Sequence, residues 1–354
     1  MQKMGNLDFF FLQRELARLE GAFFSKAYEL EPGLLRLRFN HKTRGNVDLI
    51  VELGKRIHET RFLQETPEKP SHFAGELRRL LNNGRLLSVR QLNLDRILAF
   101  ELQKAEKFFL VFEMLGAGNA LLCDSKMRII APYARAEYSI RSIKRNVSYQ
   151  PPPQEKKPAL EAKASDFNEL KGKIVAVLSK NFNLSPFYFE EACCRAGVAL
   201  EEDASRLSEK QKTALATALR SLFENPSFCV YFEEDKPVAF SPIALKKFDS
   251  FETQLFPSFS EALDFYFANA PVEAKENPAK KKLEFTLSQQ EKAVGVLLAQ
   301  AEEETQAGDW IYANSALVDE LLSLVKSKEK EKLVALAKKH GFKASLEGLD
   351  LVLE

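Results

Sequence analysis

Short runs of alternating apolar and polar residues, separated by turn residues, dominate the sequence between residues 22 and 130. Eight such runs occur, at 24–30, 34–39, 47–53, 86–89, 96–100, 107–115, 119–123 and 128–130. Glu31-Pro32-Gly33 and the tight turn Gly116-Ala117-Gly118-Asn119 are typical connections between strands that follow one another in a sheet. The first three runs predict an antiparallel meander, and the later runs predict further strands of the same domain.

Two helical segments interrupt these strands. Residues 6–20 carry apolar side chains at amphipathic helical spacing, and so do residues 73–81, where Asn82-Asn83-Gly84 supplies a left-handed stop. The stiff, extended segment Tyr149-Gln150-Pro151-Pro152-Pro153 follows the last strand. Residues 1–153 are therefore predicted to form an α+β domain of helices and antiparallel sheet, with a boundary at its end.

The texture changes after this boundary. Residues 154–172 are predicted to be a linker with a lead-in helix. Residues 173–271 are predicted to hold short helices and a return segment with strands. Within this region Ser185-Pro186 is typical of a helix start and Gly197 of a helix end.

A charged linker is predicted at 272–282, followed by a purely helical partial arm at 283–354. Its first helix has a seam of residues spaced by three and four: Leu283, Leu287, Gln290, Val294, Leu297 and Ala301. A coiled coil and a helical bundle explain this seam equally well. No later helix follows that could return along the arm, so the seam predicts a partner helix from another chain.

The charge of the 354-residue chain is unevenly distributed. Residues 1–150 hold 25 Lys and Arg against 17 Asp and Glu, whereas the rest holds 26 against 33. Sixteen of the 19 arginines lie in the first part, and the guanidinium fork matches phosphate oxygens. The first part is therefore the candidate face for an anion or a nucleic acid. Arginines that only cover apolar surface and stay solvated are the alternative.

Several classes of protein are disfavoured. No apolar run approaches the roughly 18 to 20 residues that span a bilayer, and no signal peptide is evident, so a cytoplasmic protein without a membrane partner is expected. The four cysteines and four histidines lack the spacings of metal sites or disulfide frameworks. No nucleotide-binding loop or nucleophile elbow occurs. We expect no catalytic centre, no metal and no cofactor.

A cluster of arginines surrounds the turn at residues 82–84, namely Arg78, Arg79, Arg85, Arg90 and Arg96. Asp95 precedes Arg96, and on a strand their side chains would point to opposite faces. Asp can accept a hydrogen bond from a base edge, and Arg can hold a phosphate or a guanine. A local salt bridge at the turn is the alternative from these residues alone.

At these residues the sequence resembles the NFACT family of ribosome-associated quality-control factors, also described as fibronectin-binding-protein-A-like. The similar segments occur in order, namely 34–53, Arg56-Ile57-His58, 70–73, 77–81, 91–96, 113–124, 128–130, 149–153, 184–197, 289–292 and 310–314. The resemblance implies a first domain similar in fold to the N-terminal domain of formamidopyrimidine-DNA glycosylases. It also implies a helix-hairpin-helix region and a truncated coiled-coil arm. Met1-Gln2-Lys3 lacks the Pro and Glu of glycosylase chemistry.

The resemblance further implies binding to tRNA and to large ribosomal subunits carrying a stalled nascent chain. It implies support of template-free C-terminal tailing, with peptide transfer done by the ribosome. Asp95 and Arg96 match the family's tRNA-handling pair, so the resemblance favours RNA over a local salt bridge there. Gly116, Gly118 and Asn119 are expected to be structural, with RNA nearby.

Full-length members continue into a returning helix and an NFACT-R module, which this sequence lacks. A split gene, with a second chain that supplies the rest, and a truncated product both fit. Two other functions stay open: a glycosylase-like protein that binds or repairs DNA, and a fibronectin-binding surface adhesin. The missing N-terminal nucleophile and the missing signal peptide argue against them.

Overall fold

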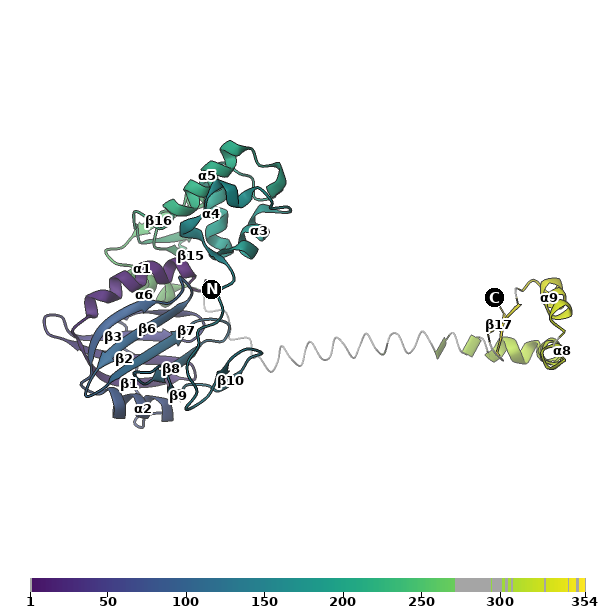
Figure 1. The fold of residues 1–354 in the computed structure, drawn as a ribbon, viewed down its shortest axis with the longest axis horizontal. Helices are drawn as coiled ribbons and strands as arrows, with labels where there is room; N and C mark the ends of the chain where they lie inside the picture. The colour runs from purple at the N-terminus through teal and green to yellow at the C-terminus, as the bar shows by residue number, and fades with distance from the viewer. Residues whose placement is uncertain are drawn as a thin grey trace. The chain divides into compact units, whose positions relative to one another are not determined.

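The computed structural model describes residues 2–270, 294, 301–302, 305–306, 308–327, 329–342, 344–347 and 350–353. It forms two compact units, Met1–Val272 and Glu273–Glu354. In Figure 1 the first unit runs from purple to green, and the described part of the second is light green to yellow. The candidate functional residues all lie in the first unit.

A nine-stranded antiparallel sheet dominates the first unit, in the order β4-β3-β2-β1-β5-β6-β7-β8-β9. Its strands are β1 (Phe23–Glu31), β2 (Leu34–His41), β3 (Gly45–Glu52), β4 (Arg56–Thr60), β5 (Arg85–Gln91), β6 (Ile97–Gln103), β7 (Lys107–Glu113), β8 (Asn119–Cys123) and β9 (Ile129–Pro132). The predicted meander is confirmed, and β4 is a strand that the sequence pattern did not reveal. The α+β fold class is confirmed as well.

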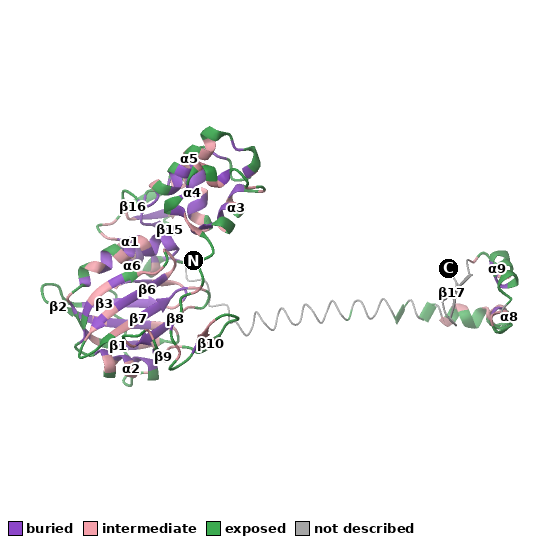
Figure 2. Cartoon of the chain, viewed as in Figure 1, coloured by how far each residue is buried: buried purple, intermediate pink, exposed green. Residues whose placement is uncertain are grey.

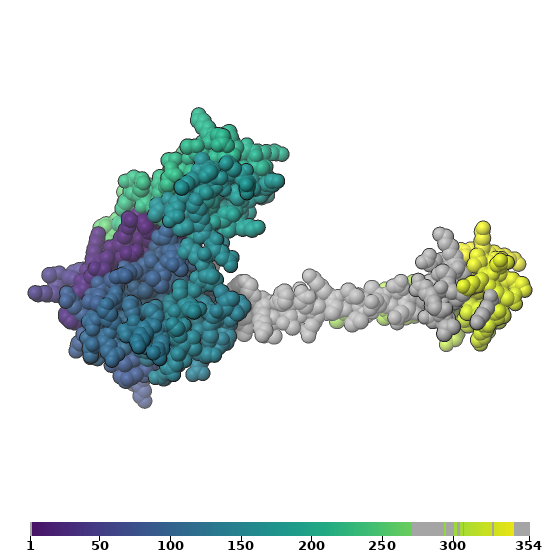
Figure 3. All heavy atoms as spheres, viewed as in Figure 1, coloured from purple at the N-terminus to yellow at the C-terminus, as the bar shows by residue number. Residues whose placement is uncertain are grey.

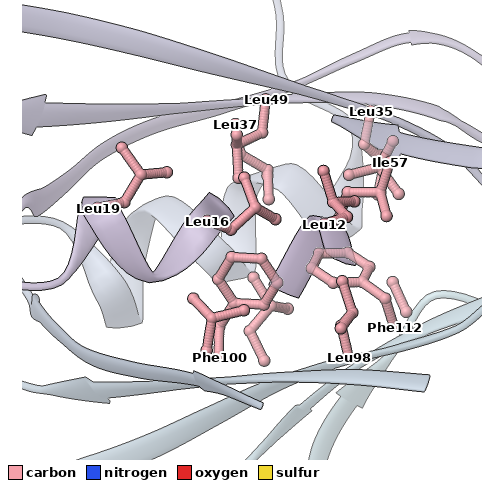
Figure 4. Close-up of a cluster of buried hydrophobic side chains, with 14 of the residues drawn as sticks. Leu12, Leu16, Leu19, Leu35, Leu37, Leu49, Ile57, Leu98, Phe100 and Phe112 are labelled. Atoms are coloured by element: carbon pink, nitrogen blue, oxygen red, sulfur yellow. The ribbon is translucent and has the colours of Figure 1, made fainter. Parts of the chain in front are cut away.

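Helix α1 (Asn6–Leu16) and the short η1 (Ala17–Leu19) lie between the two halves of this sheet. Figure 4 shows Leu12, Leu16 and Leu19 between Leu35, Leu37, Leu49 and Ile57 on one side and Leu98, Phe100 and Phe112 on the other. The halves are joined over a short stretch, where Phe23 of β1 pairs with Arg85 of β5 and backbone hydrogen bonds join Leu86 to Ala22 (2.8 Å) and Phe24 to Gly84 (2.8 Å). The sheet can therefore bend around α1, which fills the core.

Two further segments cover the sheet. Helix α2 (His72–Leu81) packs Phe73, Leu77 and Leu81 into the same core, and Asn83, two residues after its end, has a φ of 58°. The predicted helix and its left-handed stop are confirmed. On the opposite face, the segment that holds β10 (Ala136–Glu137) and β11 (Ser142–Ile143) covers β6 to β9 through Ile143 and Tyr149.

A second core lies in the helical region of the first unit. Its helices are α3 (Ile174–Asn181), α4 (Pro186–Ala196) and α5 (Glu209–Ser221), with short η2 (Ala159–Glu161), η3 (Ala164–Phe167) and η4 (Ala204–Arg206). Strands β12 (Lys157–Pro158) and β13 (Phe182–Asn183) pair in parallel. Helix α4 begins after Ser185 with Pro186 and ends at Gly197 in the left-handed region, as predicted. Its assignment to a helix-hairpin-helix motif stays a prediction.

Two elements contribute to both cores, because one face of each packs into the sheet core and the opposite face packs into the helical core. Helix α1 places Leu7 and Phe11 in the helical core and Leu12 in the sheet core. A small sheet of β14 (Cys229–Glu233), β15 (Lys236–Ser241) and β16 (Glu252–Leu255) does the same, with Tyr231 on one face and Val230 on the other. η5 (Lys246–Phe248) and α6 (Phe259–Asn269) complete the unit.

These shared elements make residues 2–270 one continuous unit of two lobes. Figure 3 shows the purple segment of α1 where the lower and the upper lobe meet. Figure 2 shows buried residues along the central strands and exposed residues on the outer surface of α5. The subdivision at residues 153 and 172 stays a prediction, although the end of this unit at Val272 lies next to the linker expected at 272–282.

The second unit holds α8 (Ser315–Lys326) and α9 (Lys330–Lys339), which share a small core around Leu321, Leu333 and Ala337. A hairpin of β17 (Ala344–Glu347) and β18 (Asp350–Leu353) follows. The expectation of a purely helical arm is wrong here, because two four-residue runs are too short to reveal a strand period.

The predicted linker 272–282 and the seam positions Leu283, Leu287, Gln290 and Leu297 lie outside the described residues. Within the described part of the chain, we find no helix with both the length and the apolar character needed to cross a bilayer.

Candidate nucleic-acid interface

Asp95 and Arg96 lie in the turn that connects β5 to β6. The amide of Asp95 donates to the carbonyl of Leu92 (2.9 Å), and the amide of Leu92 donates to the carbonyl of Ile97 (2.9 Å). The two residues between Leu92 and Asp95, Asn93 and Leu94, have φ values of 55° and 48°. Positive φ at both central residues is the pattern of a type I′ hairpin turn.

The expectation that Asp95 and Arg96 sit on a strand with opposite side-chain directions is therefore wrong. The turn places both residues before β6 begins at Ile97. The Asp95 carboxylate accepts a hydrogen bond from the backbone amide of Arg96 at 2.7 Å. The pair is thus joined through the backbone, and no salt bridge between the two side chains occurs among the described contacts.

Side chains from distant parts of the chain hold this turn. Gln91 donates from Nε2 to the carbonyls of Asp95 (2.8 Å) and Asn6 (2.9 Å). Asn183, at the end of β13, donates from Nδ2 to the carbonyls of Asn93 (3.1 Å) and Leu94 (3.2 Å). The turn is therefore fixed by α1 and by the helical lobe as well as by its own strands.

An open pocket of about 450 Å³ lies beside the turn. Asp95 and Arg96 line it together with the N-terminal segment 3–6, the segment 153–156 and residues 183–186. The first residues of α1 and α4, Asn6 and Pro186, both belong to its wall. Helix N-termini carry partial positive charge, so they add to an environment that suits an anion.

The cations of this pocket are Lys3, Arg96 and Lys156, and its carboxylates are Asp95 and Glu155. Lys156 donates to the carbonyl of Ser179 at 2.7 Å. Among the described residues the guanidinium of Arg96 has neither a hydrogen bond nor an ion pair, although the side chain is only partly exposed. A half-buried, unpaired guanidinium in an open pocket is suited to bind a phosphate or a base edge.

The buried residue Asp8 stabilises the wall of the pocket through two hydrogen bonds. Its carboxyl accepts from the amide of Gly5 (2.5 Å), which lines the pocket, and from the hydroxyl of Tyr188 on α4. Burial raises the pKa of Asp8 to about 7, although both hydrogen bonds oppose the shift. Sequence reasoning missed this residue, because a single Asp in an apolar helix carries no spacing signal.

The turn Gly116–Asn119 lies beside this pocket and has a structural role. A Cβ on Gly118 would lie 2.1 Å from the amide nitrogen of Gly54, and one on Gly54 would lie 2.6 Å from the carbonyl oxygen of Gly116. Asn119 is buried and bonds both the amide (3.0 Å) and the carbonyl (2.8 Å) of Ala134. The β7–β8 and β3–β4 turns therefore touch backbone to backbone, which only glycine allows.

This turn also borders a second open pocket, of about 550 Å³, and the two pockets share Leu115 and Pro153. In its wall, Glu113 accepts both arms of Arg141 (2.5 and 3.0 Å) and the hydroxyl of Tyr149 (2.9 Å). Both members of the ion pair are at least nine-tenths buried. Sequence reasoning missed this network, because its residues lie 28 and 36 positions apart.

The other predicted arginines do not line the pocket of Arg96. Arg78 on α2 donates to the carbonyl of Ala27 (2.7 Å) and lies 4.7 Å from the ring centre of Tyr28. Exposed Arg79 pairs with Glu76 (2.8 Å) on the same helix. Arg90 lies 3.7 Å from Glu101, and Arg85 is exposed at the start of β5. Arg78 therefore has a structural role, whereas the other three are surface cations.

The described residues include no cluster of His, Cys, Asp and Glu that could hold a metal ion. Cys123 and Cys193 are buried, and burial raises the pKa of each thiol to about 12, so neither is a reactive thiolate. The chemistry available at the site is ionic and hydrogen-bonding contact with a ligand.

The sequence of this chain matches a known protein family. The family described as NFACT N-terminal and middle domains matches residues 8–337. The chain belongs to this family. The match includes both cores, the Asp95–Arg96 turn and the glycine turn, so the resemblance seen in the ordered motifs is confirmed.

Curated members of the NFACT family are similar over different lengths. The archaeal Rqc2 homolog aRqcH of Methanocaldococcus jannaschii is 30% identical over 349 residues, which is 91% of this chain and 51% of that protein. Ribosome quality control complex subunit 2 of Saccharomyces cerevisiae is 36% identical over 133 residues, 37% of this chain and 13% of that protein. The Rqc2 homolog RqcH of Bacillus subtilis is 26% identical over 264 residues, covering 67% and 43%. The chain thus spans about half the length of the archaeal relative and less of the other two.

Solved structures support the fold. The fibrinogen binding protein from Staphylococcus aureus gives a TM-score of 0.63 at 18% identity, over 74% of this chain and 98% of that one. The N-terminal part of the fibronectin/fibrinogen-binding protein from Streptococcus suis gives 0.59 at 19% identity, over 75% and 99%. At these identities the likeness establishes the shared fold.

Proposed function

We propose that this chain acts in ribosome quality control and binds tRNA on stalled large ribosomal subunits through the pocket of Asp95 and Arg96. The names of the archaeal, yeast and bacterial relatives support the first part. The observation that carries the second part is the guanidinium of Arg96. It is held at a fixed turn, has no partner among the described residues, and shares its pocket with Lys3 and Lys156.

A phosphate is the ligand group that best fits this pocket. Arg96 offers a planar fork of donors, and two lysines and two helix N-termini add positive charge at the same wall. The Asp95 carboxylate is engaged on one oxygen by the amide of Arg96, so its other oxygen can accept from a base amino group. In this proposal Arg96 binds the RNA backbone and Asp95 contacts a base.

The remaining basic residues lie outside this pocket. Arg79, Arg85 and Arg90 are exposed and can add weak, salt-sensitive contacts to RNA phosphates. The chain itself then performs no covalent chemistry and needs no cofactor, and the ribosome transfers the peptide during template-free C-terminal tailing. The role of the chain is to hold tRNA where this transfer can occur.

Purified tRNA tests the proposal. Its binding to the full chain is measured by fluorescence anisotropy from 50 to 300 mM KCl, for the wild type and for Asp95→Ala, Arg96→Ala and Arg206→Ala. Arg206 is an exposed arginine on η4, so its replacement removes the same charge outside the pocket. We expect Arg96→Ala to weaken binding about tenfold and to lower the salt slope by about 0.7 to 0.9. Arg206→Ala should bind like the wild type.

Two results would count against the proposal. Equal losses in Arg96→Ala and Arg206→Ala would mean that binding depends on overall charge. Binding to duplex DNA as tight as to tRNA, with the same sensitivity to Arg96, would favour the DNA-binding alternative. The ribosomal part of the proposal is tested by sequencing the RNA that copurifies with the chain from cells. Enrichment of large-subunit RNA is expected.

A further inference from the structure

We infer that Asn183 is a positioning residue for Arg96, which makes RNA binding by the sheet lobe depend on the helical lobe. This inference rests on the proposed function. Asn183 is the last residue of β13, directly before the segment that starts α4. It lies 90 and 89 positions from Asn93 and Leu94, whose carbonyls it binds.

The turn needs outside support, because one of its residues is in an unfavourable conformation. Leu94 has a φ of 48°, a left-handed conformation that branched apolar side chains rarely adopt and that glycine adopts readily. Hairpin turns of this kind normally carry Gly at one of the two central positions. The turn therefore holds its shape only if surrounding contacts favour it.

Asn183 provides such contacts through one amide group. Its Nδ2 donates to the carbonyls of both left-handed residues, at 3.1 and 3.2 Å, and its Oδ1 accepts from Nδ2 of Asn6 at 2.5 Å. The carbonyl of Asn6 in turn accepts from Gln91, which also binds the carbonyl of Asp95. A network of hydrogen bonds thus links α1 to the two central residues of the turn through Asn183 and to Asp95 through Gln91.

Only an amide fits this position. The two turn carbonyls require a donor, and a carboxylate at the same place would present negative oxygens to them. Asn6 requires an acceptor on the other side, which a lysine or an alanine does not offer. Asn183→Asp therefore keeps the size and shape of the side chain and removes the two contacts that hold the turn.

The backbone of this turn continues directly into Arg96, whose carbonyl accepts from the amide of Met114 at 2.8 Å. Release of the Asn93–Leu94 carbonyls frees the part of the loop that sets the direction of the Arg96 side chain. The expected loss of RNA affinity then comes from misalignment of the Arg96 guanidinium, because its charge is unchanged. Because Asn183 lines the same pocket, direct contact between Asn183 and RNA is the alternative that the test has to separate.

A double-mutant cycle separates these two roles. tRNA binding by the full chain is measured for Asn183→Ala, Asn183→Asp, Arg96→Ala and Asn183→Ala combined with Arg96→Ala. Asn181→Ala is the matched control, because Asn181 is two residues away and donates to the carbonyl of Val177 in its own helix (2.8 Å). We expect both Asn183 variants to lose about five- to tenfold in affinity with a lower salt slope, and Asn181→Ala to lose none.

In the background of Arg96→Ala, the Asn183 replacement should cost less than twofold further. Additive losses would overturn the inference in favour of direct contact, and wild-type affinity of both Asn183 variants would overturn it altogether.

Amide hydrogen exchange at Leu92 and Asp95 tests the positioning without RNA. Exchange at these two amides should rise at least tenfold in Asn183→Ala and stay unchanged in Asn181→Ala, while exchange in β6 stays slow in both. Unchanged protection in Asn183→Ala would contradict the inference. If the turn loosens as expected but Arg96→Ala binds tRNA like the wild type, the proposed function fails and the positioning of the turn stands.

Discussion

Two turns at the same end of the sheet reach their shapes by different means. The Gly116–Asn119 turn is packed against the backbone of Gly54, and Asn119 is buried with its amide fully bonded. The Asp95–Arg96 turn is held by side-chain amides of Gln91 and Asn183, and the Arg96 guanidinium beside it has no hydrogen bond or ion pair with any residue that the structure describes. The first turn stabilises the fold, whereas the second turn places a charged group in an open pocket.

The two turns therefore differ in how well they tolerate substitution. A turn in which an added Cβ would lie 2.1 Å from a neighbouring backbone nitrogen has no room for a side chain, so its sequence serves stability. A turn that is fixed by hydrogen bonds from other elements can carry any side chain that the ligand requires. Substitutions in the two turns and in the residues around them test this contrast.

Gly118→Ala should be the most damaging substitution. The new Cβ would meet the amide of Gly54, and the φ of 78° is unfavourable for alanine as well. We expect a loss of about 4 kcal/mol in the free energy of unfolding, measured by urea denaturation, or failure to fold.

Gly116→Ala is its control in the same turn. Gly116 has a φ of 58°, but a Cβ there would meet nothing within 4 Å. It should cost only about 1 kcal/mol, which is the penalty of the left-handed region alone. Equal losses in the two variants would mean that backbone contact with Gly54 is not what fixes the turn.

Arg141→Ala should rank second. It leaves the carboxylate of Glu113 buried with Tyr149 as its remaining side-chain donor. Removal of one partner from a buried ion pair typically costs about 3 to 5 kcal/mol, and we expect about 3 kcal/mol here. Arg145→Ala, which removes an exposed arginine from the same region, should change stability by less than about 0.5 kcal/mol in the same urea titration.

Asp8 links the pocket to pH. The pKa of Asp8 is about 7 in the folded chain against 3.8 for an ordinary Asp, so the folded chain keeps a proton that the unfolded chain releases between these values. The free energy of unfolding should therefore fall as pH rises from about 4 to about 7, by about 3 kcal/mol in total.

Asp8→Asn should remove this fall, as measured by thermal unfolding across the pH range. Asp203 offers a contrast, because hydrogen bonds from Ser205 and Gly172 lower its pKa. Asp203→Asn should keep the fall between pH 4 and 7. A wild-type stability that does not change with pH in this window would contradict the assignment of Asp8.

Arg96→Ala should have the smallest effect on stability. The side chain makes no described hydrogen bond or ion pair, so we expect a change of about 0.5 kcal/mol or less in the free energy of unfolding. The expected tenfold loss of tRNA affinity would then be a loss of function in an intact fold. A destabilisation comparable to that of Arg141→Ala would instead make Arg96 a structural residue.

Much of the local structure could be predicted from the sequence. The alternating runs gave eight of the strands in the large sheet, because a period of two with intervening Gly, Pro and Asn is a local signal. The ends of α2 and α4 followed from Asn83, Pro186 and Gly197 for the same reason. The family could be identified from the order of short motifs, none of which is specific alone.

The tertiary structure decided how these elements form a site. Residues 6, 91 and 183 meet at one turn only because α1 and the small sheet belong to two cores, which fixes the helical lobe against the sheet lobe. Asp95 and Arg96 were selected by sequence, but their place in a left-handed turn and the free guanidinium depend on hydrogen bonds across about 90 and 180 positions. Periodicity and capping are local signals that involve a few residues, so helices, strands and their ends can be predicted from the sequence. Contacts between distant segments form only in the folded chain, and they determine which side chain is left available for a ligand.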